Sequence, residues 1–257
     1  MSFAVAVDPA NPGQFFACCG LFELASRLTK QATARFEGSR FVVDAGPTLP
    51  RLLEQLTAQP LVRLDPEDET SSPVGVPPPF DLRIDWWSDA AAGGRELKTW
   101  AGRMDSVRIA QAMASAIRDS RFHTEQLLNV GCVVFSPEDP TKKVEPFYFD
   151  SRRAPNAHSR DAGFSPDALG LTTTAFPAVE ILCLVGLQRC RPAPAGTKRV
   201  FEYRTWQVPL PISVMAAVVC GAANLPGSST YRFESWFRTG QRKHKAFRPA
   251  VVTQRGA

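Results

Sequence analysis

One segment restricts the fold of this chain more than any other, the apolar stretch of residues 176–187. Pro177 suits the first turn of a helix because its φ angle is already helical and its missing N–H would have no partner there. The residues that follow are apolar around nearly the whole helix axis, and such a helix is stable only where other elements cover it on all sides. The segment therefore predicts a helix at the centre of the core.

The residues before this helix have a different character. Residues 147–150 form a short aromatic run that predicts a strand ending at a loop. The loop, residues 151–161, carries three arginines and offers little to a core, so we expect it to be solvated or docked on an anionic partner. Two interpretations stay open: a core element with a surface loop, or a rigid scaffold that presents arginines to phosphates.

The composition is that of an ordinary globular protein. The chain has 257 residues, 44% hydrophobic and 21% charged, enough to bury a core as one large domain or two small ones. Its apolar runs fall short of the ~20 residues of a membrane span, and its first residues lack the features of a signal peptide. We therefore expect a cytoplasmic protein with no membrane partner.

The cysteine pattern and the net charge bear on three kinds of protein: disulfide-linked, zinc-binding and nucleic-acid-binding. The cysteines lie mostly inside apolar runs and show no paired CxxC spacing, so the sequence favours buried free thiols over a disulfide framework or a zinc site. The net charge of +5 and the pI near 9.0 permit a nucleic-acid partner without requiring one.

The first part of the chain predicts a β-α-β-α opening. Asn11 and Pro12 have the properties of a helix cap and a first helical residue. A hairpin broken at Gly38 is an alternative to a single second strand. The expected elements are a strand at 3–8, a helix at 13–28, a strand or hairpin at 34–44 and a helix at 49–56.

An acidic, proline-rich stretch, residues 65–79, follows this opening. Its composition predicts no packed element, so we expect a linker or an exposed loop. The sequence thus predicts an N-terminal part, residues 1–64, and a larger part, residues 80–257.

The larger part combines strands and helices. Asp105 is placed to cap a helix with one apolar and one polar face. After Glu234 the chain has no acid and several basic residues, which predicts a cationic patch or arm. Further expected elements are paired strands at 130–135 and 144–149, strands at 80–87 and 199–209, a helix at 212–220 and a last strand at 231–237. The whole pattern predicts an α+β fold, with mixed or antiparallel sheets and packed helices.

Aromatic and basic residues mix between positions 86 and 108. Three tryptophans alternate there with cations, a mixture that stacks bases and contacts phosphates in nucleic-acid-binding proteins. Buried tryptophans beside solvated charges give the same string, so both interpretations stay open. The candidate nucleic-acid-binding residues, from this region, the arginine loop and the basic tail, are Lys98, Arg103, Arg108, Arg152, Arg153, Asn156, Arg160, Arg242, Lys243 and Lys245.

Little in the sequence points to catalysis. Asp85 or Asp89 begins a loose acid-then-Glu-x-Lys pattern of Mg²⁺-dependent nucleases, in which carboxylates hold the metal ion. Glu96 and Lys98 complete it, but the string is common by chance, and a solvated strand end gives the same residues. The histidines share no triad or metal-ligand spacing, and no glycine-rich phosphate loop is present. We therefore expect no catalytic residue, no metal and no cofactor.

Five segments spread over most of the chain form a recognisable set. They are residues 11–20 (NPGQFFACCG), 85–87 (DWW), 98–102 (KTWAG), 149–153 (FDSRR) and 186–192 (GLQRCRP). As a set they resemble a CRISPR-associated protein family of type I-U/I-G loci, small effector-associated proteins related to the large subunit of the Cascade surveillance complex.

The resemblance implies a non-enzymatic role in crRNA-guided DNA targeting, with cleavage left to a separate helicase-nuclease. Its implied partners are crRNA, target DNA and the other Cascade subunits. In such complexes base pairing reads the sequence, while protein subunits contact the backbone. Two other classes stay open: a structural subunit that bridges proteins without touching nucleic acid, and the Mg²⁺-dependent nuclease.

Overall fold

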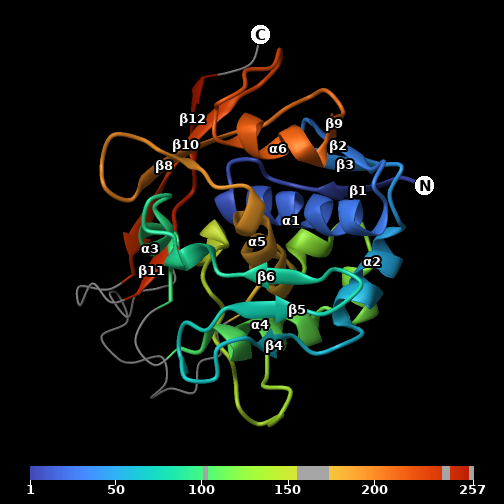
Figure 1. The fold of residues 1–257 in the computed structure, drawn as a ribbon, viewed down its shortest axis with the longest axis vertical. Coiled ribbons are helices and arrows are strands. Elements are labelled where there is room, and N and C mark those ends of the chain that lie inside the picture. The colour runs from blue at the N-terminus through green and yellow to red at the C-terminus, as the bar shows by residue number, and fades with distance from the viewer. Residues whose placement is uncertain (101–103, 155–173, 239–243, 255–257) are drawn as a thin grey trace.

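An α+β fold surrounds a pair of crossed helices (Figure 1). The computed structural model describes residues 1–100, 104–154, 174–238 and 244–254. The helices are α1 (Pro12–Leu28), α2 (Leu49–Thr57), α3 (Gly94–Leu97), α4 (Ser106–Ala116), α5 (Pro177–Arg189) and α6 (Ile212–Val219), with 3-10 turns η1 (Trp86–Ser88), η2 (Ser120–Phe122), η3 (Leu127–Asn129) and η4 (Ser151–Arg153). The strands are β1 (Phe3–Ala6), β2 (Thr33–Glu37), β3 (Arg40–Asp44), β4 (Val62–Arg63), β5 (Val74–Val76), β6 (Leu82–Ile84), β7 (Ala193–Pro194), β8 (Val200–Arg204), β9 (Leu210–Pro211), β10 (Thr230–Phe237), β11 (Lys245–Phe247) and β12 (Val251–Gln254).

Within the described ranges the strands form antiparallel sheets. One has the order β1-β3-β2-β9, another β11-β10-β8-β7 with β12 also paired to β10, and a third β4-β5-β6. The opening is β-α-β-β-α, because the second predicted strand is a hairpin of β2 and β3. Gly38 makes its turn at φ 59°, in the left-handed region that favours glycine. The predicted α+β class with antiparallel sheets is confirmed, with the hairpin alternative in place of a single strand.

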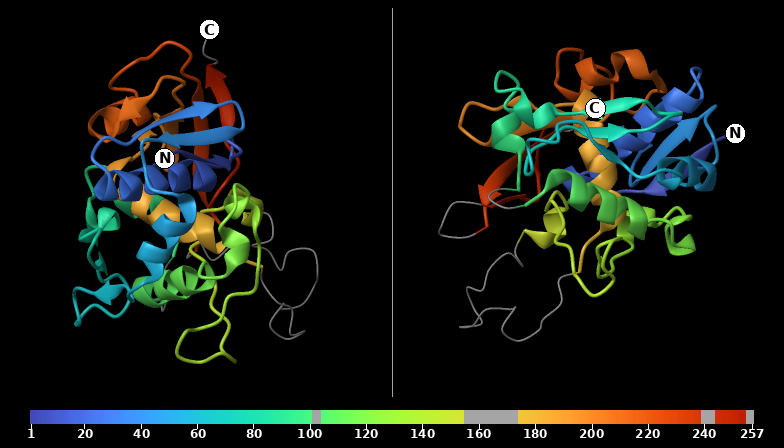
Figure 2. Two further views of the ribbon diagram at one scale, coloured as in Figure 1. Left: turned by 90° about the vertical axis from the view of Figure 1, so that its right-hand side faces the viewer. Right: turned by 60° about the horizontal axis from the view of Figure 1, so that its bottom comes forward.

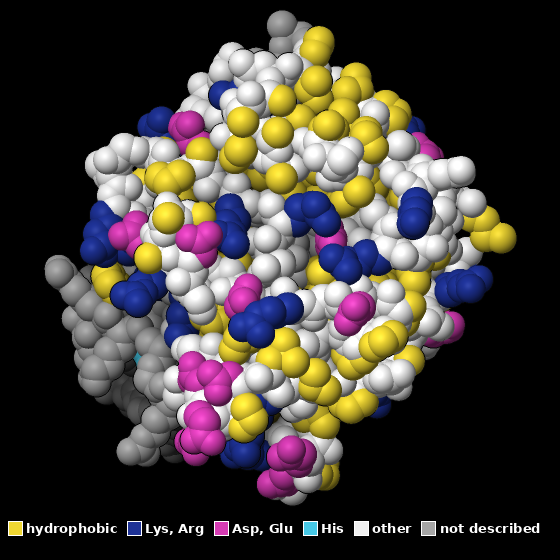
Figure 3. All heavy atoms as spheres, in the orientation of Figure 1, with side chains coloured by type: hydrophobic (Ala, Val, Ile, Leu, Met, Phe, Trp, Pro, Cys, Tyr) yellow, Lys and Arg dark blue, Asp and Glu magenta, His cyan; other side chains and the backbone are white. Residues whose placement is uncertain are grey.

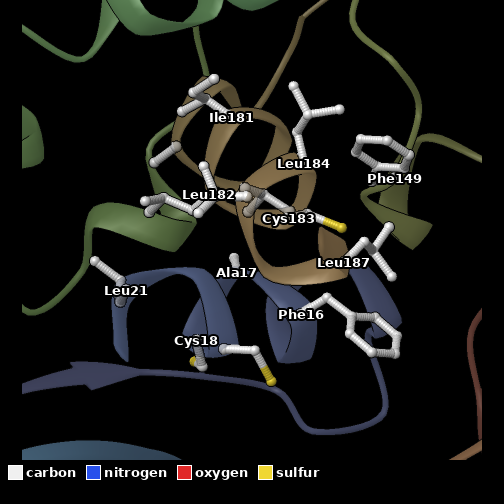
Figure 4. Packing of buried hydrophobic residues seen from close by; sticks show 14 of the residues in the cluster. Phe16, Ala17, Cys18, Leu21, Phe149, Ile181, Leu182, Cys183, Leu184 and Leu187 are labelled. Atoms are coloured by element: carbon white, nitrogen blue, oxygen red, sulfur yellow. The ribbon is translucent and has the colours of Figure 1, made fainter. Parts of the chain in front are cut away.

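The predicted central helix is α5, and it crosses α1 in the middle of the molecule (Figures 1 and 4). Both helices are buried along most of their length. At the crossing, a Cβ on Gly186 would lie 1.9 Å from the carbonyl oxygen of Phe16, and a Cβ on Gly20 would lie 2.0 Å from that of Leu182. Ala17 points from α1 toward α5 beside this contact (Figure 4). The two backbones therefore touch, and neither glycine has room for a side chain.

The other elements cover this helix pair. The first sheet and α6 lie on one side, and β4-β5-β6 with α4 lies on the other (Figures 1 and 2). Buried residues before position 64 and after position 80 belong to one hydrophobic cluster. Of the cysteines, Cys18, Cys19, Cys183 and Cys190 are buried free thiols, as predicted, whereas Cys132 is half-buried and Cys220 is exposed. No helix in the described part of the chain is long and apolar enough to cross a membrane.

The stretch predicted as an unpacked linker contains β5, the middle strand of the third sheet. Val74 and Val76 are buried, and a Cβ on Gly75 would lie 2.5 Å from Cγ2 of Val62. The close approach of the neighbouring strand explains how a very short apolar run forms a packed strand. The prediction that residues 65–79 hold no packed element was wrong at this point.

The paired strands predicted at 130–135 and 144–149 do not form a ladder; the isolated β-bridge between these regions joins Phe135 to Lys143, one residue before the second predicted strand. Tyr148 has φ 68°, which interrupts the extended backbone. The backbone N–H groups of the next two residues donate to the carboxyl group of Glu180 on α5, and not to a neighbouring strand. Aromatic residues are buried here by packing on the central helix, so their pattern imitates that of a strand.

The described part of the basic tail belongs to the fold. β11 and β12 both pair with β10, and Phe247 is fully buried. The prediction that residues 231–237 form the last strand was therefore wrong, because short apolar runs continue the sheet beyond the basic residues. The strands predicted at 80–87 and 199–209 are shorter than expected, reduced to β6 and β8.

Candidate nucleic-acid interface

A hollow of about 550 Å³ lies where α3, the turn before β8 and the β10–β11 hairpin meet. These elements are at the left of Figure 1. Four of its ten lining residues are cationic, and one carboxylate and one aromatic ring also line it. We call it the basic pocket, and its lining residues are Ala90, Ala91, Gly93, Arg95, Glu96, Pro194, Lys198, Arg199, Phe237 and Lys245.

Two glycines shape the turn that carries one wall of the pocket. Gly93 has φ 72°, and a Cβ on Gly94 would lie 2.2 Å from the carbonyl oxygen of Trp86. The left-handed backbone favours glycine at position 93, and the close approach leaves no room for a side chain at position 94. The turn thus packs α3 tightly on the segment of η1, which places Arg95 and Glu96 at the pocket.

Lys245 joins α3 to the β10–β11 hairpin. Its Nζ donates to the carbonyl oxygens of Arg95, at 2.9 Å, and Glu96, at 2.7 Å. Burial lowers the pKa of the Lys245 ammonium to about 8; the Glu96 carboxylate opposes this shift, and neighbouring cations, Arg199 first among them, add to it. The ammonium is therefore charged at neutral pH but close to its titration range.

The pocket has more positive than negative charge. The Glu96 carboxylate accepts a hydrogen bond from the backbone N–H of Arg199 at 3.2 Å and lies 3.7 Å from Nζ of Lys198. One carboxylate thus faces four cationic side chains, since Arg95 and Lys245 also line the hollow. A concave surface with this imbalance concentrates anions from solution.

Phe237 lines the same hollow, and Arg199 lies near both its ring and that of Trp236. The guanidinium carbon of Arg199 lies 4.8 Å from the ring centre of Phe237 and 5.2 Å from that of Trp236. Trp236 is 39% exposed. Arg199 has φ 66°, uncommon for a residue with a side chain, and its buried Nε has no hydrogen-bond partner in the described structure. An arginine with an unused donor and an exposed tryptophan thus lie side by side.

Of the residues predicted from sequence, Lys245 lines the pocket, while Lys98 lies near it with its ammonium turned inward. The Lys98 Nζ donates to Oγ of Ser71 and lies 5.1 Å from the ring centre of Trp100. Burial lowers the pKa of Lys98. Arg108 lies elsewhere, on an exposed face of α4, where its Nε is 3.5 Å from the carboxylate of the helix cap Asp105.

Arg152 is held inside the fold. Its guanidinium donates to both oxygens of Asp150, at 2.9 and 2.6 Å, and to the carbonyl oxygen of Leu128 at 2.7 Å. It also donates to Asn129 at 3.0 Å and lies 3.5 Å from the ring centre of Phe176. Asp150 is fully buried. These contacts favour a structural role for Arg152, the alternative to phosphate binding.

Arg153 and Arg238, both half-buried, lie near the same tyrosine. The guanidinium carbon of Arg238 stacks 3.2 Å from the ring centre of Tyr148, and its charge and that of Arg153 both act on the tyrosine hydroxyl. The Nε atoms of both arginines are buried without a hydrogen-bond partner within the described ranges. Five further predicted residues, Arg103, Asn156, Arg160, Arg242 and Lys243, lie outside the described residues.

The acids of the nuclease pattern each lie beside a cation. The structure does not gather them: across the described residues, no group of three or more His, Cys, Asp or Glu side chains is placed to hold a metal ion. The pairs are Asp85 with Arg83, Asp89 with Arg191 and Glu96 with Lys198.

The segments that carry the family resemblance meet around the crossed helices. Nδ2 of Asn11 donates to Asp150 at 3.0 Å. The side-chain oxygen of Gln188 accepts hydrogen bonds from the backbone N–H groups of Asp85 and Trp86, at 3.0 and 3.1 Å. These described contacts join residues inside the fold. The segments therefore hold together the packing around α1 and α5, which we call the framework.

Sequence reasoning missed Arg95, Lys198 and Arg199. Their signal was weak, because Arg95 and the adjacent pair Lys198 and Arg199 belong to two distant segments, and only the fold brings them together with Lys245. The double glycine before Arg95 was visible as a turn, but nothing in the sequence links it to β10.

No known protein family, curated protein or solved structure matches this chain.

Proposed function

We propose that this chain is a non-catalytic subunit of a type I CRISPR–Cas RNA-guided surveillance complex, and that it contacts the crRNA or target-DNA backbone in the cytoplasm. Its partners are crRNA, target DNA and the other Cascade subunits. The assignment to CRISPR loci rests on the resemblance of the five segments. The contact with nucleic acid is supported by one observation of the structure, the basic pocket.

The net positive charge of the pocket and its hydrogen-bond donors are suited to binding a phosphate backbone. Its four cations exceed its one acid, and Arg199 has a buried Nε without a partner in the described structure. Arginine and lysine side chains that neutralise phosphates release bound counterions, which is the main source of sequence-independent affinity. Such contacts position a subunit while base pairing reads the sequence.

The test is a binding titration at several salt concentrations. The purified chain, alone and assembled with the other subunits of its locus, is titrated with single-stranded RNA, single-stranded DNA and duplex DNA. We expect the logarithm of the association constant to fall linearly with the logarithm of salt, by roughly 0.7–0.9 per phosphate contact. A flat dependence, or no binding in any assembly, would contradict the proposal.

The absence of catalysis is a separate part of the proposal. The paired acids of the nuclease pattern support it, because a carboxylate held by a neighbouring cation is a weaker ligand for Mg²⁺. Incubation of the chain with single- and double-stranded substrates and Mg²⁺ or Mn²⁺ should leave them intact. Cleavage that is lost in Lys98→Ala would favour the nuclease.

A second candidate is a subunit that only bridges proteins, and α6 favours it. This helix has no charged residue, and its outer face is largely exposed. Hydrophobic side chains gather over α6 at the top of the face in Figure 3. Val208 and Val214 are each 39% exposed, and Val251 is 62% exposed. Exposed apolar surface of this kind is typical of protein interfaces. Reconstitution separates the candidates, since a bridging subunit joins the complex and adds no salt-dependent affinity.

A further inference from the structure

We propose that the basic pocket and Trp236 together form a site for single-stranded nucleic acid, in which one phosphate lies among the four cations and an adjacent base stacks on Trp236. The inference rests on the proposed function and adds to it the strandedness of the ligand and the residue that stacks its base.

The size of the hollow argues for one strand. Its volume of about 550 Å³ is within the range of sites that enclose a small molecule. A duplex has a rigid backbone and paired bases, so it presents its phosphates on a broad convex surface and offers no free base. A single strand can place one phosphate in the hollow and turn the next base outward.

Two of the cationic side chains that line the hollow are held in place by contacts within the protein. Lys245 is fixed by two carbonyl oxygens, so its ammonium cannot move away, and it keeps a third N–H. Arg199 is fixed between its backbone hydrogen bond to Glu96 and the rings of Trp236 and Phe237, with its Nε unpaired in the described structure. Donors held in place before binding lose little entropy when an anion arrives.

Trp236 provides the stacking surface. Of the five tryptophans of the chain, four are no more than 3% exposed, whereas Trp236 is 39% exposed. It lies beside Arg199, and Arg248 approaches it at 5.0 Å. A ring flanked by cations and open to solvent is the combination that binds single strands through stacking without reading their sequence.

The same tryptophan supplies the measurement. Titration of the protein with a single-stranded homopolymer DNA should quench the fluorescence of Trp236, and Trp236→Phe should abolish the quenching. Trp236→Ala should weaken the affinity about tenfold, the usual contribution of one stacked base. A duplex of the same length should bind without comparable quenching.

The charge of the pocket is tested with Lys198, which is 72% exposed and whose ion pair in the described structure is a single one, with Glu96, so that its replacement leaves the fold intact. Lys198→Glu should weaken single-strand binding about tenfold or more and lower the salt slope. Arg40→Glu is the matched control, because Arg40 is an exposed cation on β3 paired with Glu125. It should bind as the wild type does.

The outcomes separate this proposal from the proposed function. Salt-dependent binding with no Trp236 quenching, and with Lys198→Glu equal to the wild type, overturns the pocket as the site and leaves the proposed function standing. Equal quenching by the duplex overturns the preference for single strands. No nucleic-acid binding in any assembly overturns both.

Discussion

The crossing of α1 and α5 differs from the basic pocket in almost every respect. At the crossing, glycines bring two backbones into contact, and the surrounding side chains are buried. The pocket is formed by charged side chains from three separate segments, beside an exposed tryptophan. The segments of the family resemblance belong mostly to the first region. Residues that define a recognisable sequence pattern can therefore serve the framework, while the residues that we propose to bind nucleic acid lie on less distinctive segments.

Arg152 shows how the two regions can be confused. In sequence it belongs to an arginine-rich loop of the kind that binds phosphates. In the structure, however, its guanidinium donates hydrogen bonds to Asp150 and Leu128 beside the core. Lys198 has an unremarkable sequence context and lies at the pocket. Position in the fold, and not the local density of charge, distinguishes the two.

The largest effect that we expect comes from Gly186→Ala. The new Cβ would overlap the Phe16 carbonyl, and neither helix can move without opening the core. We expect the free energy of unfolding to fall by roughly 4 kcal/mol, or folding to fail. Chemical denaturation measures this loss. Gly38→Asn is the control, because no atom lies within 4 Å of a Cβ built on Gly38 and asparagine tolerates the left-handed backbone of this position. If Gly186→Ala lowers the free energy of unfolding by less than about 1 kcal/mol, the two helices are packed more loosely than described.

Arg152→Ala tests whether this residue belongs to the framework. Its removal leaves Asp150 buried without its main cation, which costs roughly 3 kcal/mol after allowance for solvent screening of a guanidinium that is 34% exposed. The salt slope of nucleic-acid binding should stay as in the wild type. Arg108→Ala, which removes an exposed partner of Asp105, should change stability by less than about 0.5 kcal/mol. A lower slope without a loss of melting temperature would return Arg152 to the binding site.

Glu180 should make the free energy of unfolding of the protein depend on pH. Burial raises the pKa of this carboxyl from 4.5 to about 8, and the negative charge of Asp150 adds to the shift, against backbone N–H donors that oppose it. Between these two pH values the unfolded chain releases the proton and the folded chain keeps it. The free energy of unfolding should therefore decrease as pH rises from about 4.5 to 8, on the order of 3 kcal/mol in total.

Denaturation of the wild type and of Glu180→Gln at several pH values measures this contribution. The difference in the free energy of unfolding between the two proteins should change across that range and level off above pH 8. If this difference is the same at every pH, the Glu180 carboxylate is ionised in the folded state.

The smallest expected effect concerns Lys245. Because the pKa of its ammonium is about 8, raising the pH from 7 to 9 removes most of its charge, and nucleic-acid binding through the pocket should weaken several-fold. Lys245→Arg, which keeps the charge, should lose this pH dependence. Lys198→Ala should keep it, because Lys245 is unchanged in that variant. Equal pH profiles for the wild type and Lys245→Arg would place the phosphate elsewhere.

Much of the framework could be predicted from the sequence, because periodicity and end signals are local. The central helix, its proline start and the Asn11 and Asp105 caps were readable in this way. Strand β5 was missed because it depends on a neighbouring strand that approaches Gly75 closely. The false strand at 144–149 arose because packing on α5, and not pairing, buries its aromatic residues.

The candidate site was less accessible to sequence reasoning. Lys245 was identified from the acid-free tail, but its position between two carbonyl oxygens of α3 depends on contacts across about 150 residues. Arg95 and the pair Lys198 and Arg199 come together with Lys245 only when β8 pairs with β10 and α3 packs beside them. A site assembled from three distant segments leaves no local pattern to find.

The glycine crossing also has a consequence for the synthesis of the protein. Glu23 on α1 and Arg189 on α5 pair next to it, 166 positions apart. At usual elongation rates, roughly 10–30 s pass between the appearance of the two helices at the ribosome. During this interval α1, which is buried along most of its length in the folded protein, has no partner helix to cover it. We therefore expect α1 to be the segment of the nascent chain that chaperones bind first.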